Sequence, residues 1–295
     1  IKAKGAHYWG SSSAAIQLIQ RAREEGLRVW ADQYPYTTSG SDGNTVLIPR
    51  WALAGPEGSE PADNLDQRMR DPELAARIRQ DIAHEIRRRG GAERVLVLDY
   101  PNEAYVGENL REIAQSRGVD PVEMALLLQA EGDRGRRGGS RLRGFSMDEI
   151  DLDAYAAQPW VATVTDGGIA LPTDGFVHAR YYGTFPRKVR RYALERGVIT
   201  VEEAIRSSTS LPARIMGLRD RGMVREGMVA DLVVLDLQNI RDRATFFEPH
   251  QYPDGIVHVL VNGEFVVEEG DLTGALAGTL IPSAPVSPRP STQDH

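Results

Sequence analysis

The sequence contains no cysteine, no long apolar run and no excess of basic residues. Without cysteine it has no disulfide, no thiolate metal ligand and no cysteine nucleophile, which fits a reducing compartment. No apolar run reaches the ~18 residues of a membrane helix, so we predict no membrane partner. The formal net charge of −7 argues against a nucleic-acid partner, because phosphate binding needs clustered Lys and Arg. The one basic cluster, residues 134–143, lacks interleaved aromatics and is interpreted as a solvated loop.

The bulk composition is that of an ordinary globular protein. Of the 295 residues, 41% are apolar and 26% are charged. This length allows one large domain or two smaller ones. The sequence starts at Ile1 rather than Met and shows no signal peptide, so a cytoplasmic location is the default expectation.

Helix and strand patterns alternate on both sides of a less regular middle stretch. An apolar run at 27–31 predicts a buried strand, and polar residues including Asp32 and Tyr34 follow it. A second strand is predicted at 160–165, and Asp166 follows directly. Helices are predicted at 186–196 and from residue 200 onward. This alternation predicts an α/β fold with parallel strands.

The middle stretch, at about residues 40–139, is predicted to be an insertion with its own elements, which could form a lid. Asp71 and Pro72 are typical of a helix start, and apolar residues at fourfold spacing follow them. Residues 95–98 form a short strand pattern, and a further helix is predicted from Asp120. Residues 141–145 are a weak strand candidate.

The texture changes at about residue 217, where short β patterns begin. Asn262 and Gly263 separate two apolar β segments, which is the strongest short-range signal of a hairpin. We therefore divide the chain into an α/β part at 1–216, a small β module at 217–281 and a Pro/Ser-rich tail at 282–295 that we predict to be disordered.

Asp166 is the first candidate for chemistry. Polar groups at the carboxyl end of a buried strand are how barrel enzymes build active sites, and the two glycines after Asp166 allow close approach of a backbone or substrate. The alternative is an aspartate that only forms a turn before Gly-Gly.

The segment 177–187 adds a histidine, arginines and tyrosines on the predicted loop after that strand. The planar fork of Arg180 suits a substrate carboxylate. The alternatives are a solvated loop histidine at His178 and a surface ion pair at Arg180, and Arg187 is interpreted as structural. No histidine pair has the spacing of a helical metal motif, so the sequence does not contain a complete zinc site.

Several of these strings together resemble the N-acyl-D-amino-acid deacylases, or D-aminoacylases, of the amidohydrolase superfamily. The strings include His-Ala-Arg at 178–180, Tyr-Gly-Thr-Phe-Pro-Arg at 182–187 and Gly-Met-Val-Ala-Asp-Leu-Val-Val at 227–234. Further similar strings lie at 32–37, 158–161, 209–213, 217–222, 247–252 and 259–263. The resemblance covers most of the chain and is weakest in the middle insertion.

The resemblance implies a fold and a metal. The fold is the C-terminal part of a (β/α)₈ TIM-type barrel beside a small β-sandwich module. The cofactor is Zn²⁺, as one or two ions, with the main ligands expected before Ile1 and Asp166 as an accessory ligand. Some family members have a further histidine on the strand where this sequence has Asp32, Tyr34 and Tyr36, so the second ion is less secure.

The resemblance also implies a reaction and a set of roles. The reaction is hydrolysis of the amide bond of N-acyl-D-amino acids, with Asp166 as general base. Arg180 would bind the α-carboxylate, with His178, Tyr182 and Tyr34 beside it. The partner is a small N-acyl amino acid, and a homo-oligomer is left open. Two alternatives remain: an amidohydrolase acting on cyclic amides, like dihydropyrimidinase or dihydroorotase, and a non-catalytic truncated or scaffold subunit that lacks the metal ligands.

Overall fold

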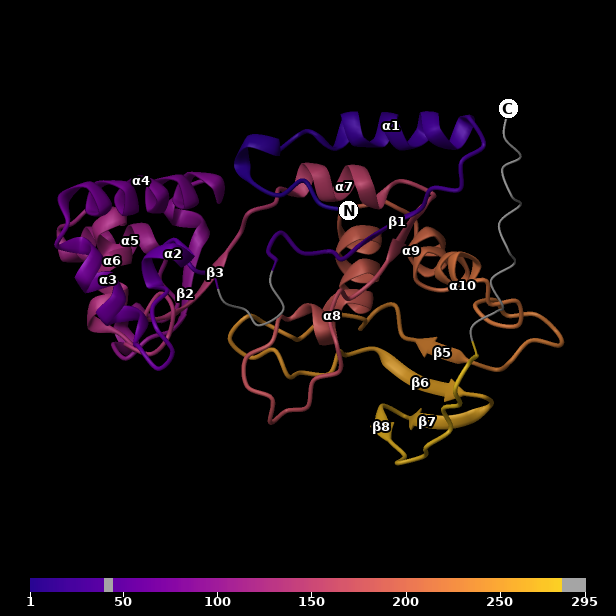
Figure 1. The fold of residues 1–295 in the computed structure, drawn as a ribbon. Coiled ribbons are helices and arrows are strands. Elements are labelled where there is room, and N and C mark those ends of the chain that lie inside the picture. Colours follow the sequence, from indigo (N-terminus) through magenta and orange to yellow (C-terminus); the bar gives the residue numbers. More distant parts are fainter. Residues whose placement is uncertain (40–44, 283–295) are drawn as a thin grey trace.

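The computed structural model describes residues 1–39 and 45–282. Figure 1 shows two groups of elements: a mainly helical group drawn in purple at one side, and the remaining elements beside it. The predicted tail falls largely on residues 283–295 and the start of the predicted insertion falls on residues 40–44, and both lie outside the described residues. None of the described helices is long and apolar enough to span a membrane.

The helical group corresponds to the predicted insertion and extends to Gly144, because its last strand pairs with its first. Its helices are α2 (Arg50–Leu53), α3 (Pro61–Met69), α4 (Pro72–Arg88), α5 (Leu110–Arg117) and α6 (Pro121–Glu131), with 3₁₀ turns η2 (Ala92–Arg94) and η3 (Glu103–Tyr105). Strands β2 (Val95–Asp99) and β3 (Arg141–Gly144) pair antiparallel. The weak strand candidate at 141–145 is thereby confirmed.

Helix α4 shows why this part folds as the sequence predicts. The Asp71 carboxylate accepts hydrogen bonds from the backbone N–H groups of Glu73 and Leu74, which caps the helix start. Ile78, Ile82 and Ile86, four residues apart, are buried in the core of this group.

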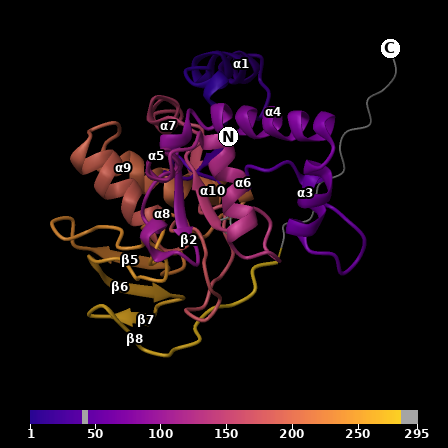
Figure 2. The same cartoon turned by 90° about the vertical axis from the view of Figure 1, so that its left-hand side faces the viewer.

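The second group carries the parallel strands. It comprises η1 (Ala6–Tyr8), α1 (Ser12–Glu24), β1 (Ala31–Gln33), α7 (Glu149–Ala156), β4 (Val161–Thr163), α8 (Arg180–Arg187), the π-helix η4 (Lys188–Glu195), α9 (Val201–Ser208) and α10 (Ser210–Met216). Strands β1 and β4 pair in parallel, with Ala31 opposite Val161 and Gln33 opposite Thr163. Helix α1 lies over α7 in both views (Figures 1 and 2). The α/β fold is confirmed.

Two predicted boundaries are wrong. The strand predicted at 27–31 begins only at Ala31, and Leu27 is exposed because this segment runs outside the sheet. The helix predicted at 186–196 begins at Arg180, so Pro186 lies inside it and the chain continues as a π-helix. Proline removes one backbone donor, and the wider turn that follows accommodates this break. A Cβ on Gly183 would lie 2.3 Å from the Tyr36 hydroxyl, so glycine lets α8 pack against the end of β1.

The β module forms one antiparallel sheet of four strands in sequence order. They are β5 (Leu232–Leu235), β6 (Ile256–Val261), β7 (Glu264–Glu268) and β8 (Asp271–Leu272). The predicted hairpin is confirmed: Asn262 and Gly263 join β6 to β7 with φ angles of 52° and 84°, as a type I′ turn requires.

Candidate functional site

An open pocket with a cavity volume of about 280 Å³ lies at the carboxyl ends of β1 and β4. It is lined by Ile1, Lys2, Asp32, Gln33, Tyr34 and Asp166. Because the two strands are parallel and in register, the residues that follow them emerge at one edge of the sheet. This is why Tyr34 and Asp166 meet although they are far apart in the sequence.

The Asp166 carboxylate contacts two cationic side chains. Its Oδ2 lies 2.8 Å from the ammonium of Lys2 and 3.3 Å from Nη1 of Arg180, whose Nη2 donates to the Asp166 backbone carbonyl. Burial alone would raise the pKa of the Asp166 carboxyl, but the hydrogen bond from Lys2 and the charge of Arg180 outweigh it and hold that pKa below its usual value. Asp166 is therefore ionised at neutral pH. Its φ of 48° lies in the left-handed region, which aspartate tolerates better than most residues.

The two cations share one aromatic ring. The guanidinium of Arg180 lies 4.5 Å from the centre of the Tyr34 ring, and the Lys2 ammonium lies 4.8 Å from it. Arg180 is only 2% exposed, so its charge is largely shielded from solvent. Lys2 and Arg180 thus both face the Asp166 carboxylate, and a second carboxylate, that of Asp32, lines the same pocket.

His178 fixes the backbone of Arg180 through a hydrogen bond. Its side chain is fully buried, and its Nδ1 accepts a hydrogen bond of 3.0 Å from the Arg180 backbone N–H, which places the proton on Nε2, 3.4 Å from the Thr38 carbonyl. Burial, with the charges of Arg143 and Arg180, lowers the pKa of His178 to about 2. The imidazole is therefore neutral, and neither nitrogen is free for a substrate or a metal.

Tyr182 faces away from the pocket. Its hydroxyl donates to the Ala170 carbonyl at 2.7 Å and lies 3.2 Å from Nδ1 of His250. The other nitrogen of His250 lies 2.5 Å from the Gly175 carbonyl. Tyr182 and His250 thus hold the loop 164–179, which joins β4 to α8 and carries Asp166.

The structure therefore brings together Asp166, Arg180 and Tyr34 of the predicted site residues, places His178 directly behind them and leaves Tyr182 outside. The sequence reasoning missed Lys2. The signal was available: the chain has only three lysines, at positions 2, 4 and 188, and uses arginine for its other cations. A compact ammonium and a planar guanidinium make different contacts, so each of these three lysines is a candidate site residue.

The residues described do not by themselves fit a zinc site. Zinc in proteins takes three or four His, Cys, Asp or Glu ligands. Within residues 1–39 and 45–282, no three such side chains gather closely enough to hold a metal ion. Asp32 and Asp166 both line the pocket, and Oδ1 of Asp166 accepts no hydrogen bond from the described part of the chain.

The chain thus combines an α/β fold with Asp166, Lys2 and the buried Arg180, which gather near the carboxyl ends of two parallel strands, and comparison with known families identifies its family. The model of the amidohydrolase family matches residues 70–267, and the chain belongs to this family. An N-acyl-D-glutamate deacylase of Alcaligenes xylosoxydans xylosoxydans is 34% identical over 255 residues, covering 86% of this chain and 42% of the relative. An N-acyl-D-aspartate deacylase of the same organism is 40% identical over 131 residues, covering 44% and 26%.

Solved structures give the same picture. A D-aminoacylase with a binuclear metal centre superposes with a TM-score of 0.60 at 30% identity, covering 93% of this chain and 47% of that one. The zinc-bound N-acyl-D-glutamate deacylase of Bordetella bronchiseptica, solved with a phosphonate inhibitor, superposes with a TM-score of 0.58 at 30% identity, covering 89% and 44%. The chain thus spans less than half the length of these relatives.

Proposed function

We propose that the chain is the substrate-binding and proton-transfer part of a zinc-dependent N-acyl-D-amino-acid deacylase. The observation that carries the proposal is the grouping of Lys2 and Arg180 over Tyr34, beside Asp166. The similarity to deacylases of N-acyl-D-glutamate and N-acyl-D-aspartate supports the same substrate class. The product would be a carboxylate and a free D-amino acid.

The proposal includes the finer architecture. We propose that residues 1–216 belong to a (β/α)₈ barrel, with the insertion near 40–139, and that residues 217–281 belong to a β-sandwich. The support is the parallel pair β1–β4 with polar residues at its carboxyl end, the separate core of the insertion and the four-stranded antiparallel sheet. Zinc, as one or two ions, would be held chiefly by residues outside this chain, with Asp166 as an accessory ligand.

The α-carboxylate of the substrate would bind to Arg180 and Lys2. Arg180 is buried and presents a planar fork, and Lys2 adds a second charge from a segment far away in the sequence. Both cations now contact Asp166, so an arriving carboxylate would share them with it. His178 acts as a positioning residue, because its Nδ1 fixes the backbone at Arg180.

Asp166 would accept a proton from the attacking water and return it to the departing amine. Its lowered pKa keeps the carboxylate ionised at neutral pH, and it lies on the pocket wall where the amide of a bound substrate would face it. The fixed position of the α-carboxylate on Arg180 would present the amide of one enantiomer to Asp166, which is how such a site selects D-amino acids.

The test is made in the full-length enzyme. Asp166→Asn should lower kcat by about 10³-fold, the range of general-base catalysis. Arg180→Met should raise KM for N-acetyl-D-amino acids far more than for the corresponding amino-acid amides, which lack the carboxylate. Arg190→Met, at an arginine with a partly exposed side chain on η4, is the matched control and should change neither.

The proposal is wrong if Asp166→Asn keeps near-full turnover, or if Arg180→Met affects acids and amides equally. Preference for cyclic imides in the same assay would favour the cyclic-amide alternative. A zinc-loaded full-length protein without amidase activity on either class would favour the scaffold alternative.

A further inference from the structure

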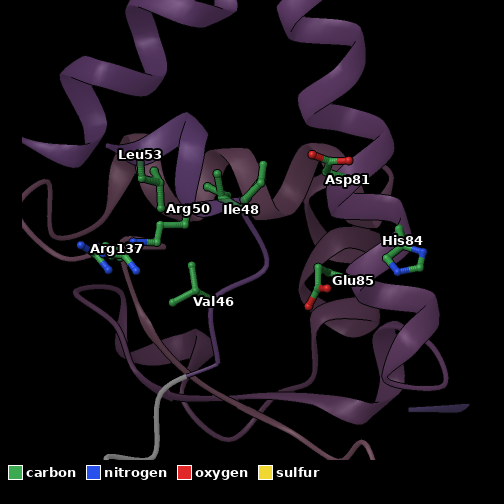
Figure 3. Close-up of a pocket in the computed structure, with 9 residues that line it drawn as sticks. Val46, Ile48, Arg50, Leu53, Asp81, His84, Glu85 and Arg137 are labelled. Atoms are coloured by element: carbon green, nitrogen blue, oxygen red, sulfur yellow. The ribbon is translucent and has the colours of Figure 1, made fainter. Parts of the chain in front are cut away.

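The insertion contains a second open pocket, with a cavity volume of about 410 Å³, and none of its lining residues lines the pocket at Asp166. It lies between α2, α4 and the segment that precedes β3 (Figure 3). Val46, Ile48 and Leu53 contribute apolar side chains to its lining. The two ends of the pocket carry opposite charges.

One end holds two arginines that have no carboxylate partner among the described residues. Arg50 and Arg137 line the pocket, lie at the same end of it in Figure 3 and are exposed. Neither makes an ion pair or a side-chain hydrogen bond with any residue that the structure describes. Two arginines close to Arg137 in the sequence are paired: Arg134 contacts Asp63 at 2.5 Å and Arg136 contacts Asp99 at 2.7 Å.

This contrast matters because two guanidinium groups that converge repel each other unless an anion lies between them. Arginine forks bind a carboxylate with two parallel hydrogen bonds. The surrounding surface supplies enough carboxylates to pair Arg134 with three acidic residues, yet within residues 1–39 and 45–282 no carboxylate pairs with Arg50 or Arg137. The arrangement therefore favours an external carboxylate at this end.

The other end holds a carboxylate that makes no ion pair with the part of the chain that the structure describes. Asp81 Oδ2 accepts a hydrogen bond of 2.9 Å from Nε1 of Trp51, and the described residues offer no ion pair to Asp81. Glu85, one turn further along α4, is already paired with Arg88 and Arg89. Asp81 is thus the group at this end that is available for a cation from outside.

We infer that this pocket binds a small zwitterion of dipeptide size, with its charges separated by an apolar body. The carboxylate would bind to Arg50 and Arg137, the ammonium to Asp81 and the apolar side chains to Val46, Ile48 and Leu53. Two extended residues span about 7 Å, so the ammonium and the carboxylate of a dipeptide lie farther apart than those of a single α-amino acid. This site is independent of the proposed deacylase function, since none of its residues belongs to the pocket at Asp166.

The test uses Leu-Leu as the probe and Trp51 fluorescence as the readout, because Trp51 contacts Asp81 directly. Leu-Leu should give a saturable change that is lost in Trp51→Phe. The double variant Arg50→Gln/Arg137→Gln should weaken binding at least tenfold, whereas Arg87→Gln, an exposed arginine on α4 outside the pocket, should not. Asp81→Asn should weaken binding of Leu-Leu but leave N-acetyl-Leu-Leu, which has no ammonium, unchanged.

Three results would overturn the inference. The first is no saturable signal with millimolar Leu-Leu in the unmodified chain. The second is equal affinity for Leu-Leu in the double arginine variant and in the unmodified chain. Both substituted positions are exposed, so the variant should fold normally, and its circular dichroism spectrum would check this. The third is inorganic phosphate binding as tightly as Leu-Leu, which would make the pocket a general anion site.

Discussion

The insertion and the pocket region around Asp166 are stabilised in different ways. The insertion has one continuous core of hydrophobic side chains between Leu47 and Leu142. Around the pocket the buried apolar residues divide into two clusters, and charged or polar side chains such as His178, Arg180 and Lys188 are buried with them. Hydrocarbon packing keeps its strength over a wide pH range, whereas buried ionisable groups depend on their partners and on pH.

The largest expected effect breaks the apolar core of the insertion. Ile82 is fully buried, so Ile82→Ala should lower the free energy of unfolding of the insertion by about 3 kcal/mol through lost burial and a residual cavity. Hydrogen exchange measured at increasing denaturant concentration should show faster exchange in α4 and β2 and unchanged exchange in β1 and β4. Ile150→Ala, at a residue 61% exposed in α7, should cost under about 0.5 kcal/mol. If Ile82→Ala speeds hydrogen exchange equally in the insertion and around the Asp166 pocket, the two regions are not stabilised separately.

The second effect concerns pH. His178 has a pKa of about 2 when folded and 6.5 as its ordinary value. Between these values the unfolded chain binds one more proton than the folded chain, so stability falls as the pH drops below 6.5. At pH 5 this loss is about 2 kcal/mol.

His178→Phe should remove this pH dependence, as measured by urea unfolding at pH 7 and pH 5. The control is His84→Gln, at an exposed histidine of the insertion, which should keep the profile of the unmodified chain. If the free energy of unfolding of His178→Phe still falls between pH 7 and pH 5 as it does in the unmodified chain, His178 is not the group that causes the pH dependence.

A smaller effect tests the local signals that fold the insertion. Asp71→Ala removes the side-chain acceptor for two backbone N–H groups and should cost about 1 kcal/mol of unfolding free energy. Asp71→Asn keeps an acceptor oxygen and should cost much less. If the two substitutions cost the same, the charge of Asp71 rather than its cap geometry stabilises α4.

The smallest effect sharpens the electrostatics of the pocket. Lys2→Met removes the hydrogen bond that lowers the pKa of Asp166, so this pKa should rise, by an amount that carboxyl NMR titration would measure. Asp254, whose pKa is lowered by the hydrogen bond from Arg241, should titrate as before. A pKa of Asp166 that does not move would mean that Arg180 alone holds it.

The sequence predicted those elements that local signals define. The cap at Asp71, the capping box of Thr200 and Glu203, and the turn at Asn262 and Gly263 all depend on neighbouring residues and are confirmed. The starts of β1 and α8 were wrong, because they are set by packing between distant segments, such as Gly183 against Tyr36.

The site was predicted only in part for the same reason. Asp166 and Tyr34 follow strands, which the sequence makes visible, but Lys2 meets Asp166 from 164 residues away. Tyr182 was expected beside Arg180 on a loop. Both lie on α8, where residues two apart point to different sides, so only Arg180 contacts Asp166 and Tyr34.

The loop 164–179 carries the proposed base and leads directly into the arginine that would bind the carboxylate. Asp166 and Arg180 are only 14 residues apart on one continuous segment, held by Tyr182 and His250. Any drift in the length or anchoring of this segment displaces both groups at once. A change of substrate preference that preserves catalysis should therefore keep the length of this loop constant.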